Sequence, residues 1–466
     1  MSRFCRGQVQ RHRSRCCGVK SSDQAMRIGL YLHARLRPMK VLVAGATGLI
    51  GTAVCSRLIQ EGHEVYRVVR PGRSRRCAGS REIVLDVARA LDPADWHSHL
   101  SGIDAVVNCV GVLQDGLQDD PRAVHYSAAE ALFKACAQTG VAKVIHFSAI
   151  GVDRLQPSPF SSSKLAGDEA LTALDLDWVI LRPSVVLGRP VYGASALFRG
   201  LAALPLLPVM PNTGHLQVVQ LDDVVATVVF FLHPDSPSRL ALEMAGPEAL
   251  LMSDVIDQYR CWFGWRKARE FVVPGWAARL LYRAGDLAGM LGWRPAMRTN
   301  AAKEITRGAT GDPQPWIRTT GLQPSSLSSA LAANPATVQE RWFARLYFIK
   351  PAIFVVLSFF WITTGIISLT SGWRSGVDLL INTALSALAE PAVVAGALAD
   401  IAVGTLIAWR PTARLGLWGA IGISLFYAVC GTILRPDLWN EPLGPLMKIL
   451  PILVVHFVAA AILEER

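Results

Sequence analysis

The spacing of hydrophobic residues divides the chain into two regions. From Lys40 onward, short apolar runs alternate with segments in which apolar residues recur every three or four positions. Short apolar runs are typical of buried strands, and the wider spacing is typical of amphipathic helices. From about residue 350 the chain instead carries long apolar segments. The pattern therefore predicts a mixed α/β region over 39–340 and a region of apolar helices over 341–466.

The first region predicts a doubly wound parallel sheet of the Rossmann type. A strand is expected over 41–44, then a helix, then a second strand over 65–69. Further strands are expected within 82–87, 104–111, 142–151 and 177–188, and a helix over 127–140. Strands that alternate with helices form parallel sheets, which bind ligands at the carboxyl ends of their strands. That rule places these residues along one crevice: Asp86, Val87, Asn108, Gly111, Ser148 and Pro183.

The turn after the first strand, GATGLIG, predicts a nucleotide-binding site. Its glycines, Gly45, Gly48 and Gly51, allow a tight turn, a close approach to a pyrophosphate and close helix packing. The helix that follows offers free N–H groups and a partial positive charge to phosphates. The predicted nucleotide contacts in this turn are Gly45, Thr47, Gly48, Leu49, Ile50 and Gly51.

The end of the second strand favours NADP(H) over NAD(H). NAD-binding chains place an acidic residue there to accept a hydrogen bond from the ribose 2′-hydroxyl. This chain has Arg70, followed by Arg73. A guanidinium suits a 2′-phosphate and offers no acceptor to a hydroxyl. The alternative is that these arginines only belong to a solvated loop.

Several motifs resemble the short-chain dehydrogenase/reductase superfamily, in its extended-to-atypical branch. They are GATGLIG (45–51), LDV (85–87), NCVG (108–111), SAIG (148–151), FSSSK (160–164), LRPS (181–184) and LDDVV (221–225). The resemblance covers about residues 39–335. Within that branch the chain resembles proteins related to the nucleotide-binding accessory subunit of complex I and ubiquinone-associated relatives.

The resemblance implies roles for Ser148 and Lys164 and a missing group at Phe160. In the superfamily, a tyrosine exchanges the proton at the substrate oxygen, a lysine four residues later binds the nicotinamide ribose, and a serine holds the substrate oxygen. Ser148 and Lys164 match, whereas Phe160 has no proton to give. A positioned acid or base contributes ~10²–10⁴-fold to a rate. We therefore expect cofactor binding to persist and ordinary carbonyl reduction to be impaired. Taken singly, Ser148 could instead cap a turn, and Lys164 could be a solvated helix residue.

Four apolar segments predict a four-span membrane domain that contacts the lipid bilayer. They cover about 350–370, 392–409, 415–434 and 446–463, and each approaches the ~20 residues that cross hydrocarbon. Buried helices of a soluble domain are the alternative. The module resembles the DoxX-like family of small membrane proteins, whose members are often linked with quinone or thiol redox. That resemblance implies a quinone or a respiratory-chain partner.

Basic residues near the ends of the predicted spans indicate on which side of the membrane the nucleotide domain lies. Arg345 and Lys350 precede the first span, and Arg410 and Arg414 join the second and third. The positive-inside rule then places the nucleotide domain in the cytoplasm, on a bacterial inner membrane. Asp400, in the middle of the second span, is expected to face a cavity or a partner such as His456, or to be protonated between packed helices.

The net charge of +11 does not indicate a nucleic-acid-binding protein, because it is concentrated at one end. Residues 1–38 carry nine basic residues and one acidic residue, which leaves about +3 for the remainder. This extension is a disordered arm, a transit-like peptide or, in the interpretation we favour, sequence upstream of a start at Met39. The nine cysteines show no CxxC pair and no zinc spacing, so no metal site is expected.

These features support three functional hypotheses. The leading one is a membrane-anchored NADP(H)-binding dehydrogenase relative with weak or altered redox chemistry near quinones. The second is a non-catalytic nucleotide sensor or respiratory-complex assembly protein. The third is an active reductase that uses Tyr192 or water as the acid.

Overall fold

The computed structural model describes residues 37–72, 77–111, 122–154, 158–381, 383–441 and 444–463. The predicted N-terminal extension therefore lies outside the described residues, apart from its last two positions. Arg73, which was expected near a ribose phosphate, also lies outside them.

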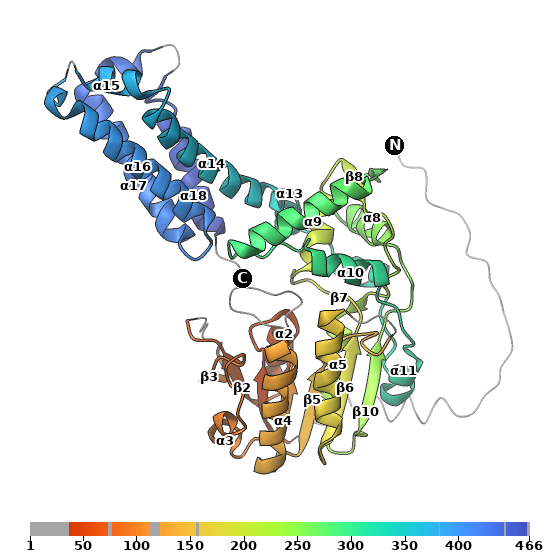
Figure 1. The fold of residues 1–466 in the computed structure, drawn as a ribbon. Helices are drawn as coiled ribbons and strands as arrows, with labels where there is room; N and C mark the ends of the chain where they lie inside the picture. Colours follow the sequence, from red (N-terminus) through yellow and green to blue (C-terminus); the bar gives the residue numbers. More distant parts are fainter. Residues whose placement is uncertain are drawn as a thin grey trace.

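Seven strands of the described chain form one parallel sheet (Figure 1), in the order β10-β6-β5-β4-β1-β2-β3. Their bounds are β1 Lys40–Ala44, β2 Glu64–Val69, β3 Ser80–Val84, β4 Ala105–Asn108, β5 Lys143–Phe147, β6 Asp177–Pro183 and β10 Leu240–Met244. The strand order reverses direction between β1 and β4, which is where doubly wound sheets bind nucleotides. The predicted fold class is confirmed.

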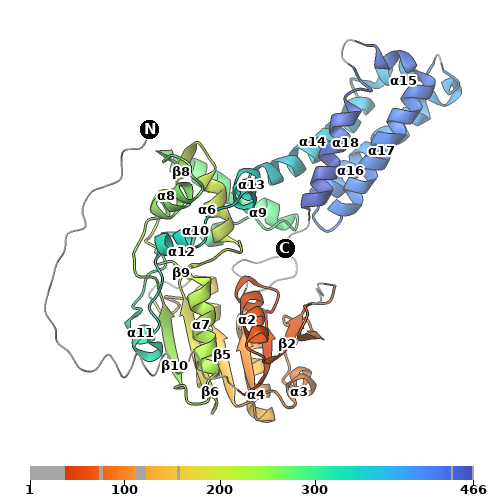
Figure 2. The ribbon, with the colours of Figure 1, turned by 180° about the vertical axis from the view of Figure 1, so that it is seen from behind.

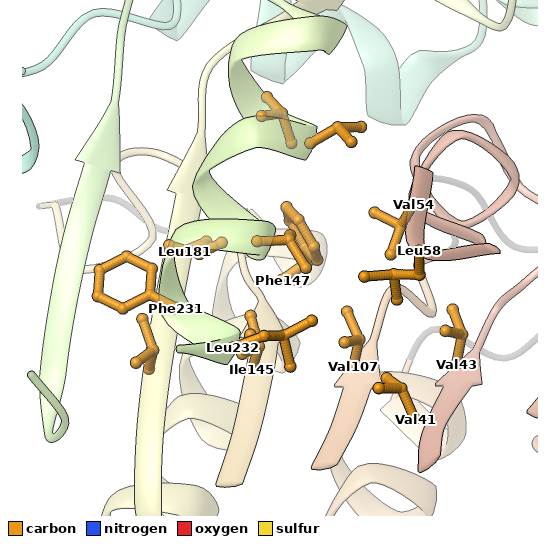
Figure 3. Close-up of a cluster of buried hydrophobic side chains, with 14 of the residues drawn as sticks. Val41, Val43, Val54, Leu58, Val107, Ile145, Phe147, Leu181, Phe231 and Leu232 are labelled. Atoms are coloured by element: carbon orange, nitrogen blue, oxygen red, sulfur yellow. The ribbon is translucent and has the colours of Figure 1, made fainter. Parts of the chain in front are cut away.

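Helices cover both faces of this sheet because its strands are apolar on both sides. Val41 and Val43 of β1 pack toward α2 (Leu49–Gln60) and α7 (Leu221–Leu232), as Figure 3 shows. Leu42 and Ala44 belong to the opposite core. That core includes residues of α3 (Ala94–Leu100), α4 (Ala128–Thr139) and α5 (Pro159–Thr172). The π-helical turn η1 (Ala123–Ser127) precedes α4.

A smaller lobe lies beyond the carboxyl ends of the strands (Figure 2). Its elements are β7 Val186–Leu187, α6 Ala194–Ala202, β8 Leu206–Val209, β9 Val219–Gln220, α8 Met252–Trp262, β11 Arg269–Val272, α9 Gly275–Met290, α10 Thr299–Arg307, α12 Leu327–Ala333 and α13 Val338–Leu346. Helix α11 (Gln314–Thr320) instead packs beside β10, and its buried Trp316 donates a 3.0 Å hydrogen bond to Thr227. Arg260 is buried and donates to the carbonyl oxygens of Ala202 and Leu204, which stabilises the end of α6.

Three helices of the described region are long and apolar enough to cross a membrane. They are α14 Ile349–Leu369, α16 Ala389–Ala408 with the 3₁₀ turn that precedes it from Ser386, and α17 Ala413–Leu434. Helix α15 (Trp373–Ile381) links the first two.

The prediction of a fourth full span is not met. The chain forms a 3₁₀ helix at Pro436–Trp439 and a turn over 445–448, so α18 covers only Ile449–Ile462. Those 14 residues rise about 21 Å. That length is shorter than the ~30 Å hydrocarbon core.

Glycines let α14 and α16 pack backbone against backbone. A Cβ atom at Gly365 would lie 2.5 Å from the carbonyl oxygen of Ala397, and one at Gly404 would lie 2.9 Å from that of Ser358. Both contacts are too close for any side chain. Close helix packing therefore explains these glycines.

Of the alternatives considered for Asp400, the pairing with His456 is not observed, and the side chain is instead hydrogen-bonded between two packed helices, α16 and α17. Asp400 is buried and accepts a 3.0 Å hydrogen bond from the hydroxyl of Tyr427. His456 accepts from the indole N–H of Trp361 at 2.9 Å, and its other ring nitrogen lies 2.7 Å from the carbonyl oxygen of Ile452. Both nitrogens of the imidazole are therefore engaged by other groups.

Candidate functional site

The glycine turn after β1 fits tightly against the end of β4. Gly45 has φ +74°, and a Cβ atom there would lie 2.8 Å from the carbonyl oxygen of Cys109. A Cβ atom at Gly51 would lie 2.2 Å from the carbonyl oxygen of Gly45. Any side chain at either position would displace the turn, so the two glycines hold it open as a cradle. In doubly wound sheets, a glycine turn at this position is where a pyrophosphate binds.

Helix α2 points its N-terminus into this cradle. Gly48 is its N-cap, and Leu49, Ile50 and Gly51 form its first turn. The first N–H groups of a helix have no acceptor within the helix, so they are available to a phosphate. Thr47 lies exposed just before the cap.

The ends of β2 and β3 bring Arg70 and Asp86 together. Arg70 follows β2 directly, and its Nε lies 3.8 Å from a carboxylate oxygen of Asp86. The other carboxylate oxygen lies 3.7 Å from Nε of Arg89. Val87, the next residue, is buried. This edge of the sheet therefore carries both a cation, which suits NADP(H), and a carboxylate, which suits NAD(H).

Lys164 is buried between the ends of β4 and β5 rather than solvated. It extends from α5, and its ammonium group donates to the carbonyl oxygens of Val110 at 3.0 Å and Phe147 at 2.8 Å. Burial lowers the pKa of Lys164 to about 8. Gly111 faces the ammonium group, because a Cβ atom there would lie 3.6 Å from Nζ.

Ser148 and Pro183 stand at the ends of the next two strands. Ser148 follows β5, and its hydroxyl donates to Asp168 at 2.9 Å. Arg182, next to Pro183 in β6, also contacts Asp168, with Nη2 at 3.0 Å from the same oxygen. Burial raises the pKa of Asp168, while the hydrogen bond from Ser148 and the charge of Arg182 oppose that rise. Ser148 therefore acts as an anchored hydroxyl rather than as a turn cap.

A polar chain connects this carboxylate to β4. The amide oxygen of Asn108 accepts from the N–H of Val110, so its amide nitrogen donates to Nδ1 of His146, at 3.2 Å. Nε2 of His146 then carries the proton and faces Asp168 at 3.5 Å. Burial lowers the pKa of His146 well below its ordinary value, so the ring is neutral.

Phe160, at the position where the sequence resemblance led us to expect a tyrosine, lies in the first turn of α5. Its ring meets that of His125 edge-on, with 5.4 Å between centroids. His125 also lies 2.9 Å from the hydroxyl of Ser163. Burial lowers the pKa of His125 to about 2, so it is neutral and no substitute acid at physiological pH. Tyr192, the other candidate acid, lies exposed before α6.

Sequence reasoning missed Asp168, His146 and Arg182. One signal was present: Asp168 follows Lys164 by four residues, the spacing that places two side chains on one helix face. His146 and Arg182 each follow a run of apolar residues within a strand. Polar groups in largely buried strands need partners, and these residues supply them for one another.

Residues 45–199 match the family model described as NAD(P)H-binding. Residues 358–457 match the DoxX-like family. The chain thus joins two known modules. A Rossmann-type domain that matches the NAD(P)H-binding model precedes a DoxX-like domain with three apolar helices in its described part. The apolar helices of the DoxX-like domain indicate that this is a membrane protein.

Two curated relatives are similar to part of the chain. A ceramide reductase of Caulobacter vibrioides is 25% identical over 41% of this chain and 60% of its own length. The photosystem II assembly factor Ycf39 of Synechocystis is 23% identical over 47% of this chain and 66% of its own length. The chain thus matches less than two thirds of either relative.

One solved structure supports the fold. The Bordetella bronchiseptica enzyme WbmG, in complex with NAD, superposes with a TM-score of 0.50. It covers 64% of this chain and 94% of its own, at 18% identity. At that identity the likeness concerns the fold alone.

Proposed function

We propose that the protein is a membrane-anchored oxidoreductase that binds NADP(H) and reduces quinone-type acceptors with altered chemistry. The observation that carries this proposal is the position of Lys164. It stands at the ends of β4 and β5, beside the glycine cradle, with phenylalanine where the acid would be. The bound nicotinamide would supply or accept a hydride. The chain would hold it through the cradle and the ammonium group of Lys164.

The choice of NADP(H) rests on Arg70. A guanidinium at the end of β2 suits a 2′-phosphate, and no acidic residue occupies that strand end. Asp86 lies within 3.8 Å of it and offers a carboxylate. Relative affinity for the two nucleotides therefore decides between them.

The choice of a quinone rests on the missing phenol. Hydride transfer to a simple ketone produces an alkoxide, a strong base that needs a positioned acid. Hydride transfer to a quinone produces a phenolate, a much weaker base that water can protonate. A crevice with Phe160 and an anchored Ser148 therefore suits a quinone better than a ketone. The membrane domain would keep the protein beside quinones dissolved in the bilayer.

The proposed orientation follows the basic residues at the span ends. Arg345 precedes α14 and Lys350 lies in its first turn. Arg410 lies between α16 and α17, and Arg414 lies in the first turn of α17. The positive-inside rule then places the nucleotide domain in the cytoplasm of a bacterial cell.

A second function, nucleotide-dependent assembly without catalysis, is favoured by two observations. Phe160 has no hydroxyl to act as the acid, whereas the glycine cradle that would bind the nucleotide is intact. The relatives include both a reductase and an assembly factor by name. In this case the nucleotide would stabilise a binding conformation rather than react.

Titration and turnover of the full chain in lipid nanodiscs separate these proposals. We expect NADPH to bind more tightly than NADH, and NADPH oxidation to depend on an added short-chain quinone and to fall at least tenfold in Lys164→Ala. Nucleotide binding without quinone reduction would favour the assembly function. Absence of binding by both nucleotides would exclude both functions.

A further inference from the structure

Helix α9 of the lobe turns its small residues inward. Ala278, Gly285 and Gly289 are its buried positions. A Cβ atom at Gly285 would lie 1.8 Å from the carbonyl oxygen of Met297, so the following chain segment lies directly against this stripe. The inward face of α9 is therefore a backbone contact with little room for large side chains.

The large apolar side chains of α9 point the other way. Trp276, Leu280, Leu287 and Met290 are 67%, 61%, 60% and 70% exposed. At 3.6 residues per turn they fall on one face of the helix, opposite the glycines. In water the stable arrangement is the reverse, because large apolar groups gain most from burial. This face therefore has a partner that is itself apolar.

Two exposed arginines share this side of the helix. By helical spacing Arg279 lies at the edge of the apolar face, and Arg283 lies within it, between Trp276 and Met290. A long arginine side chain can keep its stem among apolar groups while its guanidinium reaches a polar layer. A helix with large apolar residues, a tryptophan and arginines on one side has the composition of an interfacial membrane helix.

The end of α9 is attached to the membrane domain. The backbone N–H of Arg410 donates to the carbonyl oxygen of Leu291 at 2.9 Å. The indole of Trp293 donates to the carbonyl oxygen of Ala408 at 2.8 Å and packs on Phe354, with 4.8 Å between ring centroids. These contacts lie where α14 begins and α16 ends. In Figure 1, α9 runs across this end of the helical bundle rather than along it.

We infer that α9 lies in the headgroup region of the bilayer that α14, α16 and α17 cross. Trp276, Leu280, Leu287 and Met290 enter the acyl boundary, and Arg279 and Arg283 contact lipid phosphates. The lipid surface is the partner that the face fits, because the face continues from the level at which the chain enters the membrane. The lobe then contacts the bilayer surface through α9, and this contact fixes the distance between the bilayer and the crevice at the strand ends. This inference rests on the proposed membrane anchoring.

Photo-crosslinking in proteoliposomes tests the inference with the full chain. Benzoylphenylalanine replaces Leu280 or Leu287 in vesicles of phosphatidylcholine and phosphatidylglycerol. Phe359, exposed on α14, is the positive control, and Val84, exposed on β3, is the negative control. We expect lipid adducts at 280 and 287 in yields near that at 359 and at least tenfold above that at 84.

The controls separate the inference from the anchoring on which it rests. Adducts at 359 together with background labelling at 280 and 287 would overturn the interfacial helix alone. Crosslinks from 280 or 287 to a second copy of the chain, in place of lipid, would overturn it in favour of a protein interface. Background labelling at 359 as well would overturn both the anchoring and the inference.

Discussion

The hydroxyl of Ser148 donates a 2.9 Å hydrogen bond to the buried carboxylate of Asp168. The same carboxylate oxygen receives the guanidinium of Arg182, at 3.0 Å. The serine expected to hold a substrate oxygen is thus oriented by a charged pair beneath it. Because the hydroxyl hydrogen of Ser148 is engaged by Asp168, the hydroxyl oxygen can accept a hydrogen bond from a substrate but does not donate one.

Asp168→Asn tests this arrangement through stability. Arg182 keeps its ion pair with Asp153, at 2.7 Å, after this change. The cost should therefore lie below the about 3–5 kcal/mol of removing one partner of an isolated buried pair. Ser148→Ala removes one hydrogen bond and leaves both ion pairs of Arg182, so it costs only about 1 kcal/mol. We expect Asp168→Asn to lower the apparent Tm of the full chain in detergent more than Ser148→Ala does. Equal shifts would show that the ion pair contributes little.

Lys164→Met tests the buried ammonium group through the pH dependence of stability. The pKa of Lys164 falls from 10.5 to about 8 on folding, so between these values the unfolded chain binds the proton and the folded chain does not. Stability therefore rises as the pH increases through this window and falls as it decreases toward 8. At 1.36 kcal/mol per pKa unit the change is about 3 kcal/mol.

Denaturant unfolding of both proteins from pH 7 to pH 10.5 measures the change. We expect wild type to gain stability relative to Lys164→Met across the window, because groups common to both proteins cancel. A constant difference between the two proteins would place the ammonium group in solvent rather than between Val110 and Phe147.

Arg70→Ala tests the preference for NADP(H). Loss of a hydrogen bond to a charged group costs about 1.5–3 kcal/mol, which corresponds to roughly ten- to hundredfold in Kd for NADPH. Binding of NADH should change little. Arg89→Ala is the matched control, because Arg89 contacts the same Asp86 but is largely exposed. Similar losses for both nucleotides in Arg70→Ala would instead assign Arg70 to general support of the loop.

The sheet was predictable because its signals are local. Apolar runs, helical spacing and the glycine turn each act within a few neighbouring residues, and the six expected strands formed close to their expected limits. The seventh strand of the sheet, β10, was not predicted. The expected strand over 82–87 ends at Val84, so Asp86 lies in the loop beyond it rather than in the strand. Parallel sheets of this type bind ligands at the carboxyl ends of their strands, so the same local signals also predicted where the crevice lies.

The partners inside the site were less predictable because they depend on packing between distant segments. Asp168, His146 and Arg182 come from α5, β5 and β6, and only their burial makes the contact necessary. The same holds in the membrane domain, where Tyr427 rather than His456 contacts Asp400. Hydropathy located all four apolar segments, but the turns that shorten α18 arise from the chain before it.

Phe160→Tyr tests whether the missing phenol limits the chemistry. The ring already lies in the first turn of α5, so tyrosine adds one hydroxyl without changing the packing on His125. With NADPH and a simple ketone we expect the rate to rise, by at most ~10²–10⁴-fold. With a quinone the gain should be small, because the phenolate product needs no positioned acid. Phe160→Leu, which lacks both ring and hydroxyl, controls for packing and should accelerate neither reaction. If Phe160→Tyr binds NADPH normally and still leaves ketone reduction unchanged, the crevice does not hold a carbonyl beside this position, and the assembly function becomes the better explanation of the site.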